Sequence, residues 1–141
     1  MSVVVDASLV VALIVADERQ DTVRARLETW LEDGEALHAP GVLPFEVANV
    51  LARLVFDGLL DVTEVTGIWT DVAALGLILH PFDLERDGPE VAVMTARLRR
   101  RHATDAAHVD LARRLGTSVW TLDGPLARNA AGVGLPVQLV S

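Results

Sequence analysis

The sequence predicts an α/β protein in which a central, mostly parallel sheet is covered by helices on both faces. Three observations lead to this fold class. Short apolar runs rich in β-branched residues alternate with longer amphipathic stretches along the whole chain. The short runs are continuously apolar, as expected of strands that are buried on both faces. The 141 residues are 51% hydrophobic and contain no repeat or linker, so we expect a single domain over residues 1–141.

The first part of the chain predicts a strand, two helices and a second strand. Three valines at 3–5 form a β-branched run that ends at Asp6, and the alanine- and leucine-rich stretch 7–16 predicts a helix directly after it. Apolar residues at helical spacing predict a second helix over 19–32, with a charged outer face. A weak strand is predicted at 36–39.

The middle of the chain predicts two helices and a third strand. Pro44 suits the first turn of a helix that carries an apolar face to residue 58. A further helix is predicted over 62–75 and a strand over 77–80.

The last part of the chain predicts two long helices, two strands and a short helix. Gly88-Pro89 is expected to begin a helix that ends in an arginine run, and Thr104 is expected to cap the next helix. The remaining predicted elements are a helix over 105–115, strands over 118–121 and 137–140, and a short helix over 125–130.

Missing residue types exclude several classes of function. All twelve basic residues are arginine, which excludes phosphate-binding loops and enzymes that depend on a lysine ammonium group. The absence of cysteine excludes disulfides, thiolate metal sites and a cysteine nucleophile. The formal charge of −8 disfavours non-specific binding to nucleic acid or to anionic membranes. With no membrane-length apolar run and no signal-peptide pattern at the start, a cytoplasmic protein is expected.

Four of the twenty carboxylates stand out by their positions. Asp6 and Asp123 each follow a predicted buried strand, whereas Glu46 and Asp105 each lie in the first turn of a predicted helix. In an open parallel sheet these places converge at the carboxyl edge, where ligands bind. The four acids are therefore expected to share one pocket.

Four clustered carboxylates would repel one another unless a cation neutralised them. Oxygen ligands without cysteine favour a hard ion, so Mg²⁺ or Mn²⁺ fits better than zinc. Such a site supports metal-assisted hydrolysis of phosphodiesters, because the ion lowers the pKa of a bound water and stabilises the developing charge.

Each acid also has a purely structural interpretation. Glu46 and Asp105 could simply compensate helix dipoles, and Asp123-Gly124 could be only a turn. Asp6 is harder to explain in this way, because a carboxylate beside a buried strand usually has a partner. The functional interpretation depends on the set of four.

Four sequence blocks that contain these acids resemble the acidic blocks of PIN-domain ribonucleases. The blocks are Val-Val-Asp6-Ala-Ser8-Leu, Pro44-Phe-Glu46-Val-Ala-Asn49-Val-Leu, Thr104-Asp105-Ala-Ala-His-Val-Asp-Leu-Ala and Trp120-Thr121-Leu-Asp123. The resemblance covers nearly the whole chain, and the size is similar to that of VapC toxins of VapBC toxin–antitoxin modules. The third block differs from the commoner pattern, with Thr104 where an aromatic residue often stands.

The resemblance implies a PIN-like three-layer α/β/α fold and a Mg²⁺- or Mn²⁺-dependent endoribonuclease. Asp6, Glu46, Asp105 and Asp123 would form the acidic site that performs catalysis and binds the metal, with Asp6 and Asp105 as the first expected ligands. Ser8, Asn49 and Thr121 match polar residues that support such a site, or they could be ordinary capping and turn residues.

The resemblance also implies partners for the chain. They are an RNA substrate, a second copy in a homodimer, and a cognate VapB-type antitoxin in a heterotetramer or larger assembly. The antitoxin's C-terminal segment would lie over the active site and offer an arginine to the carboxylates.

Two further features have alternative explanations. The patch Arg97, Arg99, Arg100 and Arg101 could contact RNA phosphates, although arginines at a helix end also complement its dipole. His108, one turn after Asp105, could act as an acid or base, but isolated histidines are more often structural.

Two other functions remain open at this point. A non-catalytic α/β interaction module would use the acids only to bind a basic partner, and the presence of all four acids argues against it. A structure-specific DNA nuclease would use the same metal chemistry, but the small size of the chain argues against it.

Overall fold

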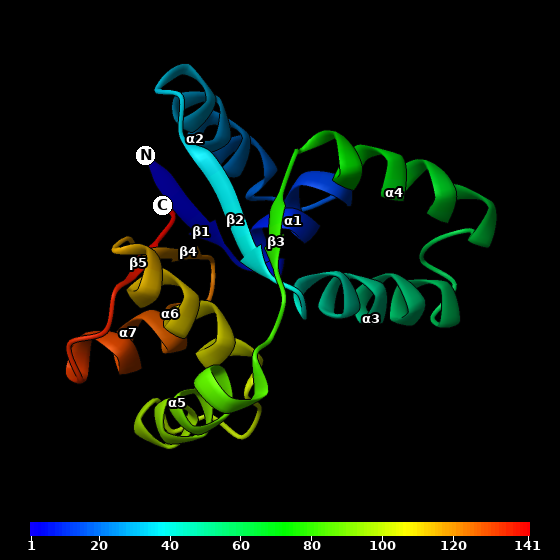
Figure 1. Cartoon of the computed structure of the whole chain (residues 1–141). Helices are drawn as coiled ribbons and strands as arrows, with labels where there is room; N and C mark the ends of the chain where they lie inside the picture. The colour runs from blue at the N-terminus through cyan, green and yellow to red at the C-terminus, as the bar shows by residue number, and fades with distance from the viewer.

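The computed structural model describes residues 1–141 and contains one five-stranded sheet (Figure 1). The strands are β1 (Ser2–Val5), β2 (Ala36–Pro40), β3 (Ile78–His80), β4 (Val119–Thr121) and β5 (Val137–Leu139). They lie in the order β3-β2-β1-β4-β5, and every neighbouring pair is parallel. The predicted parallel sheet is therefore confirmed, without an antiparallel strand.

Helices cover both faces of this sheet. One face carries α1 (Ala7–Ile14), α2 (Gln20–Glu32), α3 (Leu43–Phe56) and α4 (Val65–Ala74), and the other carries α5 (Leu84–Arg97), α6 (Thr104–Leu115) and α7 (Gly124–Gly132). Alternation along β1 shows the two layers: Val3 and Val5 belong to the first core cluster, and Val4 to the second. The three-layer α/β/α arrangement agrees with the expected fold.

The order of the strands places a switch point at β1. The chain adds β2 and β3 on one side of β1, then returns to add β4 and β5 on the other side. Connections therefore leave β1 and β4 in opposite directions, which opens a crevice above their carboxyl ends. Backbone pairing continues one residue beyond β1, because the Asp6 amide donates to the Trp120 carbonyl at 3.3 Å.

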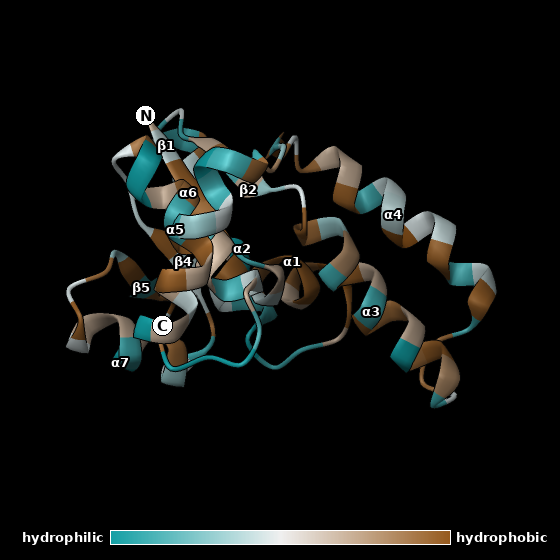
Figure 2. Cartoon of the chain, turned by 60° about the horizontal axis from the view of Figure 1, so that its bottom comes forward, coloured by the Kyte–Doolittle hydropathy of each residue, from teal (hydrophilic) through white to brown (hydrophobic).

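Helices α3 and α4 form a hairpin that projects from the sheet (Figure 1). Its far end, where Val62–Glu64 forms a 3₁₀ turn, is apolar and exposed (Figure 2). Phe56 is 91% exposed there, and Leu59 is 75% exposed. No helix in the structure has the length and apolarity needed to cross a lipid bilayer.

Two local predictions were wrong. Helix α5 starts at Leu84, before Gly88-Pro89, because Asp83 caps it by accepting a hydrogen bond from the Arg86 amide at 2.8 Å. Pro89 therefore lies inside the helix. Thr104 does not cap α6: Ala103 already has helical backbone angles, so Thr104 is the first residue of the helix.

Candidate active site

The four predicted carboxylates lie where the sequence placed them, at the carboxyl edge of the sheet. Asp6 and Asp123 are the N-caps of α1 and α7, directly beyond β1 and β4. Glu46 and Asp105 lie in the first turns of α3 and α6. Electrostatic coupling joins them, since Asp6 and Asp105 both raise the pKa of Glu46.

Asp6 is held by hydrogen bonds on both of its carboxylate oxygens. Oδ1 accepts from the Ser8 and Leu9 amides at 3.1 and 3.3 Å and from the Ser8 hydroxyl. Oδ2 accepts from the Thr121 hydroxyl. Because Asp6 is only 8% exposed, these donors fix the direction of its charge.

Ser8 and Thr121 connect the two halves of the crevice. The Ser8 hydroxyl accepts from the Leu122 amide at 3.0 Å, and the Thr121 hydroxyl accepts from the Asp123 amide at 3.0 Å. Ser8 and Thr121 therefore both hydrogen-bond to Asp6. Asn49 does not: it lies on α3 one turn after Glu46 and hydrogen-bonds to none of the four carboxylates.

Arg100 bridges the other two aspartates. Its Nη2 lies 2.6 Å from Asp123 Oδ2, and its Nε lies 3.1 Å from Asp105 Oδ2. Burial raises the pKa of Asp105, Arg100 opposes this shift, and Asp123 and Asp6 add to it. The second oxygen of Asp123 accepts from the Leu126 amide at 2.9 Å, which is the cap of α7.

Glu46 faces the buried imidazole of His108. The distance from Glu46 Oε1 to His108 Nε2 is 3.6 Å, and neither atom has a hydrogen-bond partner in the protein. His108 is 1% exposed, and its Nδ1 lies 2.8 Å from the Thr104 carbonyl. Burial raises the pKa of Glu46, and His108 opposes this shift.

These groups suit a hard divalent cation, although no three of them already form a ligand set. The donors are carboxylate oxygens, which Mg²⁺ and Mn²⁺ prefer. Glu46 Oε1 and His108 Nε2 are enclosed polar atoms without a hydrogen-bond partner in the protein. A bound cation or its water would satisfy this part of the site.

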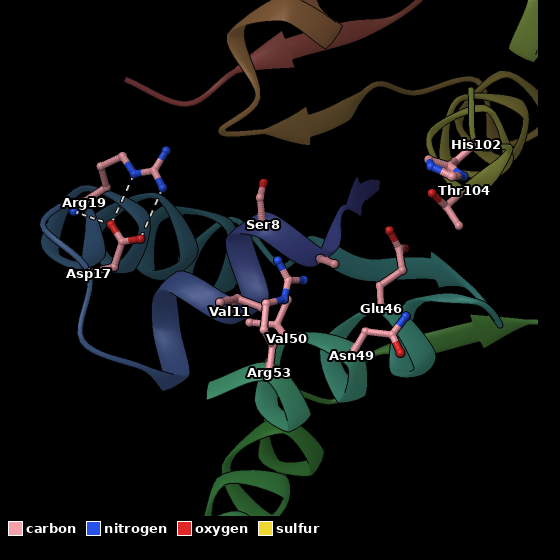
Figure 3. Close-up of a pocket in the computed structure, with 11 residues that line it drawn as sticks. Ser8, Val11, Asp17, Arg19, Glu46, Asn49, Val50, Arg53, His102 and Thr104 are labelled. Carbon is pink, nitrogen blue, oxygen red and sulfur yellow. Dashed lines mark hydrogen bonds and ion pairs between the residues drawn. The ribbon is translucent and has the colours of Figure 1, made fainter. Parts of the chain in front are cut away.

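A cleft of about 670 Å³ opens beside Glu46 and Ser8, between α1 and α3. In Figure 3, Glu46, Asn49 and Arg53 follow one another along α3, and the Arg53 guanidinium reaches toward α1. His102 lies on the same side of the cleft as Glu46, and the Asp17–Arg19 ion pair lies at the other end. The cleft therefore carries a negative charge at Glu46 and a positive charge at Arg53, farther along α3.

Sequence reasoning left the roles of Arg100 and His108 undecided. Arg100 belongs to an arginine run that could have been only a helix end, and distance alone selects it from its neighbours. The spacing from Asp105 to His108 put the imidazole near the site, but its partner Glu46 comes from another helix. Arg53, seven residues after Glu46, was not identified, although this spacing places both on one helix face.

Comparison with known proteins gives consistent matches. Residues 3–132 match the PIN domain family. The chain is 31% identical to Ribonuclease VapC3 of Pyrobaculum aerophilum in an alignment 143 residues long. The alignment covers 96% of this chain and 100% of that protein.

Two crystal structures have the same fold. PAE2754 from Pyrobaculum aerophilum superposes with a TM-score of 0.69 at 20% identity, covering 99% of this chain and 84% of that one. VapC20 of Mycobacterium tuberculosis, a sarcin–ricin loop cleaving toxin, superposes with a TM-score of 0.68 at 18% identity, covering 92% of this chain and 95% of that one.

Proposed function

Because the chain belongs to the PIN domain family, we propose that it is the toxin of a toxin–antitoxin module and a metal-dependent endoribonuclease. The observation that carries the proposal is the convergence of Asp6, Glu46, Asp105 and Asp123 from four separate segments on one sheet edge. The 31% identity to a protein named as a ribonuclease over nearly the whole chain supports RNA as the substrate.

The carboxylates would hold Mg²⁺ or Mn²⁺, with Asp6 and Asp105 as the first ligands. When bound, the ion would lower the pKa of a water molecule and stabilise charge on the phosphate oxygens. Ser8 and Thr121 keep Asp6 oriented, so this carboxylate needs no rearrangement to receive the ion. Glu46 Oε1, which has no protein donor, is placed to accept a proton from the attacking water.

The cleft beside Glu46 would receive the RNA strand. Arg53 and His102 lie along it and would contact phosphates on either side of the bond to be cut. This local positive charge would allow RNA to bind despite a net charge of −8, and a bound metal ion would offset the carboxylates of the adjacent acidic site.

The first experiment is cleavage of structured cellular RNAs and of matched DNA. We expect the wild type to cut RNA with Mg²⁺ or Mn²⁺ and to stop when EDTA is added. Asp6→Asn should abolish cutting, whereas Asp71→Asn, which changes an exposed aspartate on α4, should cut normally. Preferential cutting of DNA would favour the DNA-nuclease alternative. Failure of the folded wild type both to cut and to bind Mn²⁺ would favour the non-catalytic interaction module.

We further propose a cognate VapB-type antitoxin as partner, in a cytoplasmic complex built on a homodimer of this chain. An arginine from the antitoxin would pair with the carboxylates in place of the metal. Replacing Asp6 and Asp105 by asparagine should then weaken antitoxin binding at least about tenfold, as measured by calorimetry. Unchanged affinity would contradict a contact at this site.

A further inference from the structure

Arg100 occupies a position between two of the expected metal ligands. It lies on the loop between α5 and α6, and its guanidinium reaches Asp105 at 3.1 Å and Asp123 at 2.6 Å. We propose that Arg100 is an internal competitor of the metal ion, which holds these two carboxylates in the metal-free protein and leaves them when a divalent cation binds. The inference rests on the proposed function, because it concerns the regulation of the same site.

The contact is selective within the arginine run. Arg99 and Arg101 are exposed and form no ion pair, and Arg97 donates to the Val133 carbonyl at 3.2 Å. Only the Arg100 side chain, at 22% exposed, is drawn into the site. The Nη2 group donates a charge-assisted hydrogen bond to Asp123, and Nε faces Asp105 as an ion pair without a hydrogen bond, unlike the free charges of a solvated helix end.

The loop directs Arg100 into the site through an unusual backbone conformation. Arg99 has φ of 55° and is the only residue other than glycine with a positive φ in the chain. The turn is held because the Arg99 and Arg100 amides donate to the Ala96 and Thr95 carbonyls, at 3.1 and 3.2 Å. The fully buried Leu98 fixes the loop on the core. A left-handed residue commonly follows the end of a helix, and here it sets the direction in which the chain, and with it Arg100, leaves α5.

At Asp123, the Arg100 guanidinium and a divalent cation would compete directly for the same carboxylate. Its Oδ1 accepts from the Leu126 amide and its Oδ2 contacts Arg100, so both oxygens are engaged. A cation that uses Asp123 Oδ2 therefore has to displace the guanidinium or share that oxygen with it at like-charge repulsion. Asp6 and Glu46 have no contact with Arg100, which leaves the other side of the site open to the first encounter with the ion.

The test is a titration of the full chain with Mn²⁺ in the absence of RNA. Electron paramagnetic resonance measures the Mn²⁺ that remains free. Arg100→Gln should bind Mn²⁺ about tenfold more tightly than the wild type, since one positive charge a few ångströms away has been removed. Arg101→Gln removes the same charge from the neighbouring exposed position and should bind like the wild type. Equal or weaker binding by Arg100→Gln would overturn the inference.

A second measurement uses the wild type alone and does not depend on how the variant folds. The Arg100 Nε–H, which is buried beside Asp105 without a hydrogen bond, should exchange slowly in EDTA because it is shielded from water, and should exchange faster when Mg²⁺ is added. The Nε–H signal of Arg26, which lies over the Trp120 ring at 4.8 Å, is the internal reference. Unchanged protection of Arg100 at saturating Mg²⁺ would refute the displacement.

The two proposals can fail separately. If the wild type cuts RNA but Arg100→Gln binds Mn²⁺ no better, only the competition is wrong. If Arg100→Gln binds Mn²⁺ more tightly and neither protein cuts RNA, the competition is supported and the nuclease assignment is wrong.

Discussion

At the scale of single residues, Asp6 and Asp123 each serve two purposes. Each carboxylate accepts amide hydrogen bonds that begin a helix, and each directs its charge to the same crevice. Their positions could be predicted because an acid directly after a strand of a parallel sheet lies at the carboxyl edge of that sheet. Their partners could not be predicted, because Thr121 and Arg100 reach them across more than twenty residues of sequence.

Glu46 should make the metal-free protein less stable at neutral pH. Burial raises its pKa above the ordinary 4.5, so the folded state holds the proton more tightly than the unfolded chain does. Its ionisation therefore costs stability above the folded pKa, and this cost disappears as the pH falls below it. Glu46→Gln should raise the melting temperature at pH 7.5 by about 1–3 °C, a modest gain because the side chain is partly solvated.

The matched control is Glu28→Gln on α2, which changes an exposed glutamate. Thermal melts in EDTA at several pH values compare the two variants. The Glu46→Gln gain should shrink toward pH 4, and a gain that is the same at every pH would contradict an origin in ionisation.

His38 and His80 form a pair that the sequence did not reveal. His38 Nδ1 lies 2.8 Å from His80 Nε2 across neighbouring strands β2 and β3. Burial, and then the charge of His80, lowers the pKa of His38 below its ordinary 6.5. Because the folded pKa is depressed, this histidine contributes stability that is present above pH 6.5 and is lost on acidification.

Nuclear magnetic resonance titration of the imidazole protons measures this directly. We expect a His38 pKa below 6.5, and a higher pKa in His80→Gln, where the like charge is gone. His102→Gln changes an exposed histidine on another loop and should leave the His38 pKa as in the wild type. An unaltered His38 titration in His80→Gln would contradict the coupling.

At the scale of elements, α3 connects the acidic site to the cleft. Glu46, Asn49 and Arg53 lie on the cleft face of α3. Arg53 follows Glu46 by seven residues, so their backbone positions are separated by about 10 Å along the helix axis. In the proposed complex, the helix itself would set the distance between the reacting phosphate and a neighbouring phosphate of the RNA strand.

Arg53→Gln should weaken RNA binding without disturbing the site. In an Asp6→Asn background, which prevents cutting, we expect about fivefold lower affinity at 0.1 M salt for a single-stranded RNA. The slope of log affinity against log salt should become shallower by about 0.7, as one phosphate contact is lost. Arg24→Gln on the exposed face of α2 is the control for general charge. Equal slopes of log affinity against log salt for Arg53→Gln and Arg24→Gln would contradict a phosphate contact at Arg53.

Most elements could be predicted because their signals are local. Valine runs, apolar spacing and Gly116 at the left-handed end of α6 each fix a boundary without reference to the rest of the chain. The start of α5 could not be predicted in this way. Pro89 suggested a first turn, but the cap at Asp83 and the ion pair between buried Asp87 and exposed Arg86 extend the helix earlier.

At the scale of the whole molecule, the clustered carboxylates oppose folding when no cation is bound. Repulsion among acids on four segments is relieved only partly by Arg100 and His108. If the proposed ion binds the folded state alone, it would stabilise the entire chain by mass action.

Mn²⁺ at one hundred times its dissociation constant should add about 2.7 kcal/mol and raise the melting temperature by about 5–10 °C. EDTA should reverse the shift, and Asp105→Asn should lose most of it. Calorimetry with and without the ion provides the measurement. A wild-type melting temperature that ignores millimolar Mn²⁺ would contradict a site at these carboxylates.

The capping role of Asp6 and Asp123 has a consequence for how this protein would be silenced by mutation. Asparagine begins a helix about as well as aspartate, and the codons of the two residues differ only in the first base. A single base change can thus remove a charge from the crevice and leave α1 or α7 intact. Lineages that escape the proposed toxicity are expected to carry a folded, inert copy that binds its antitoxin more weakly.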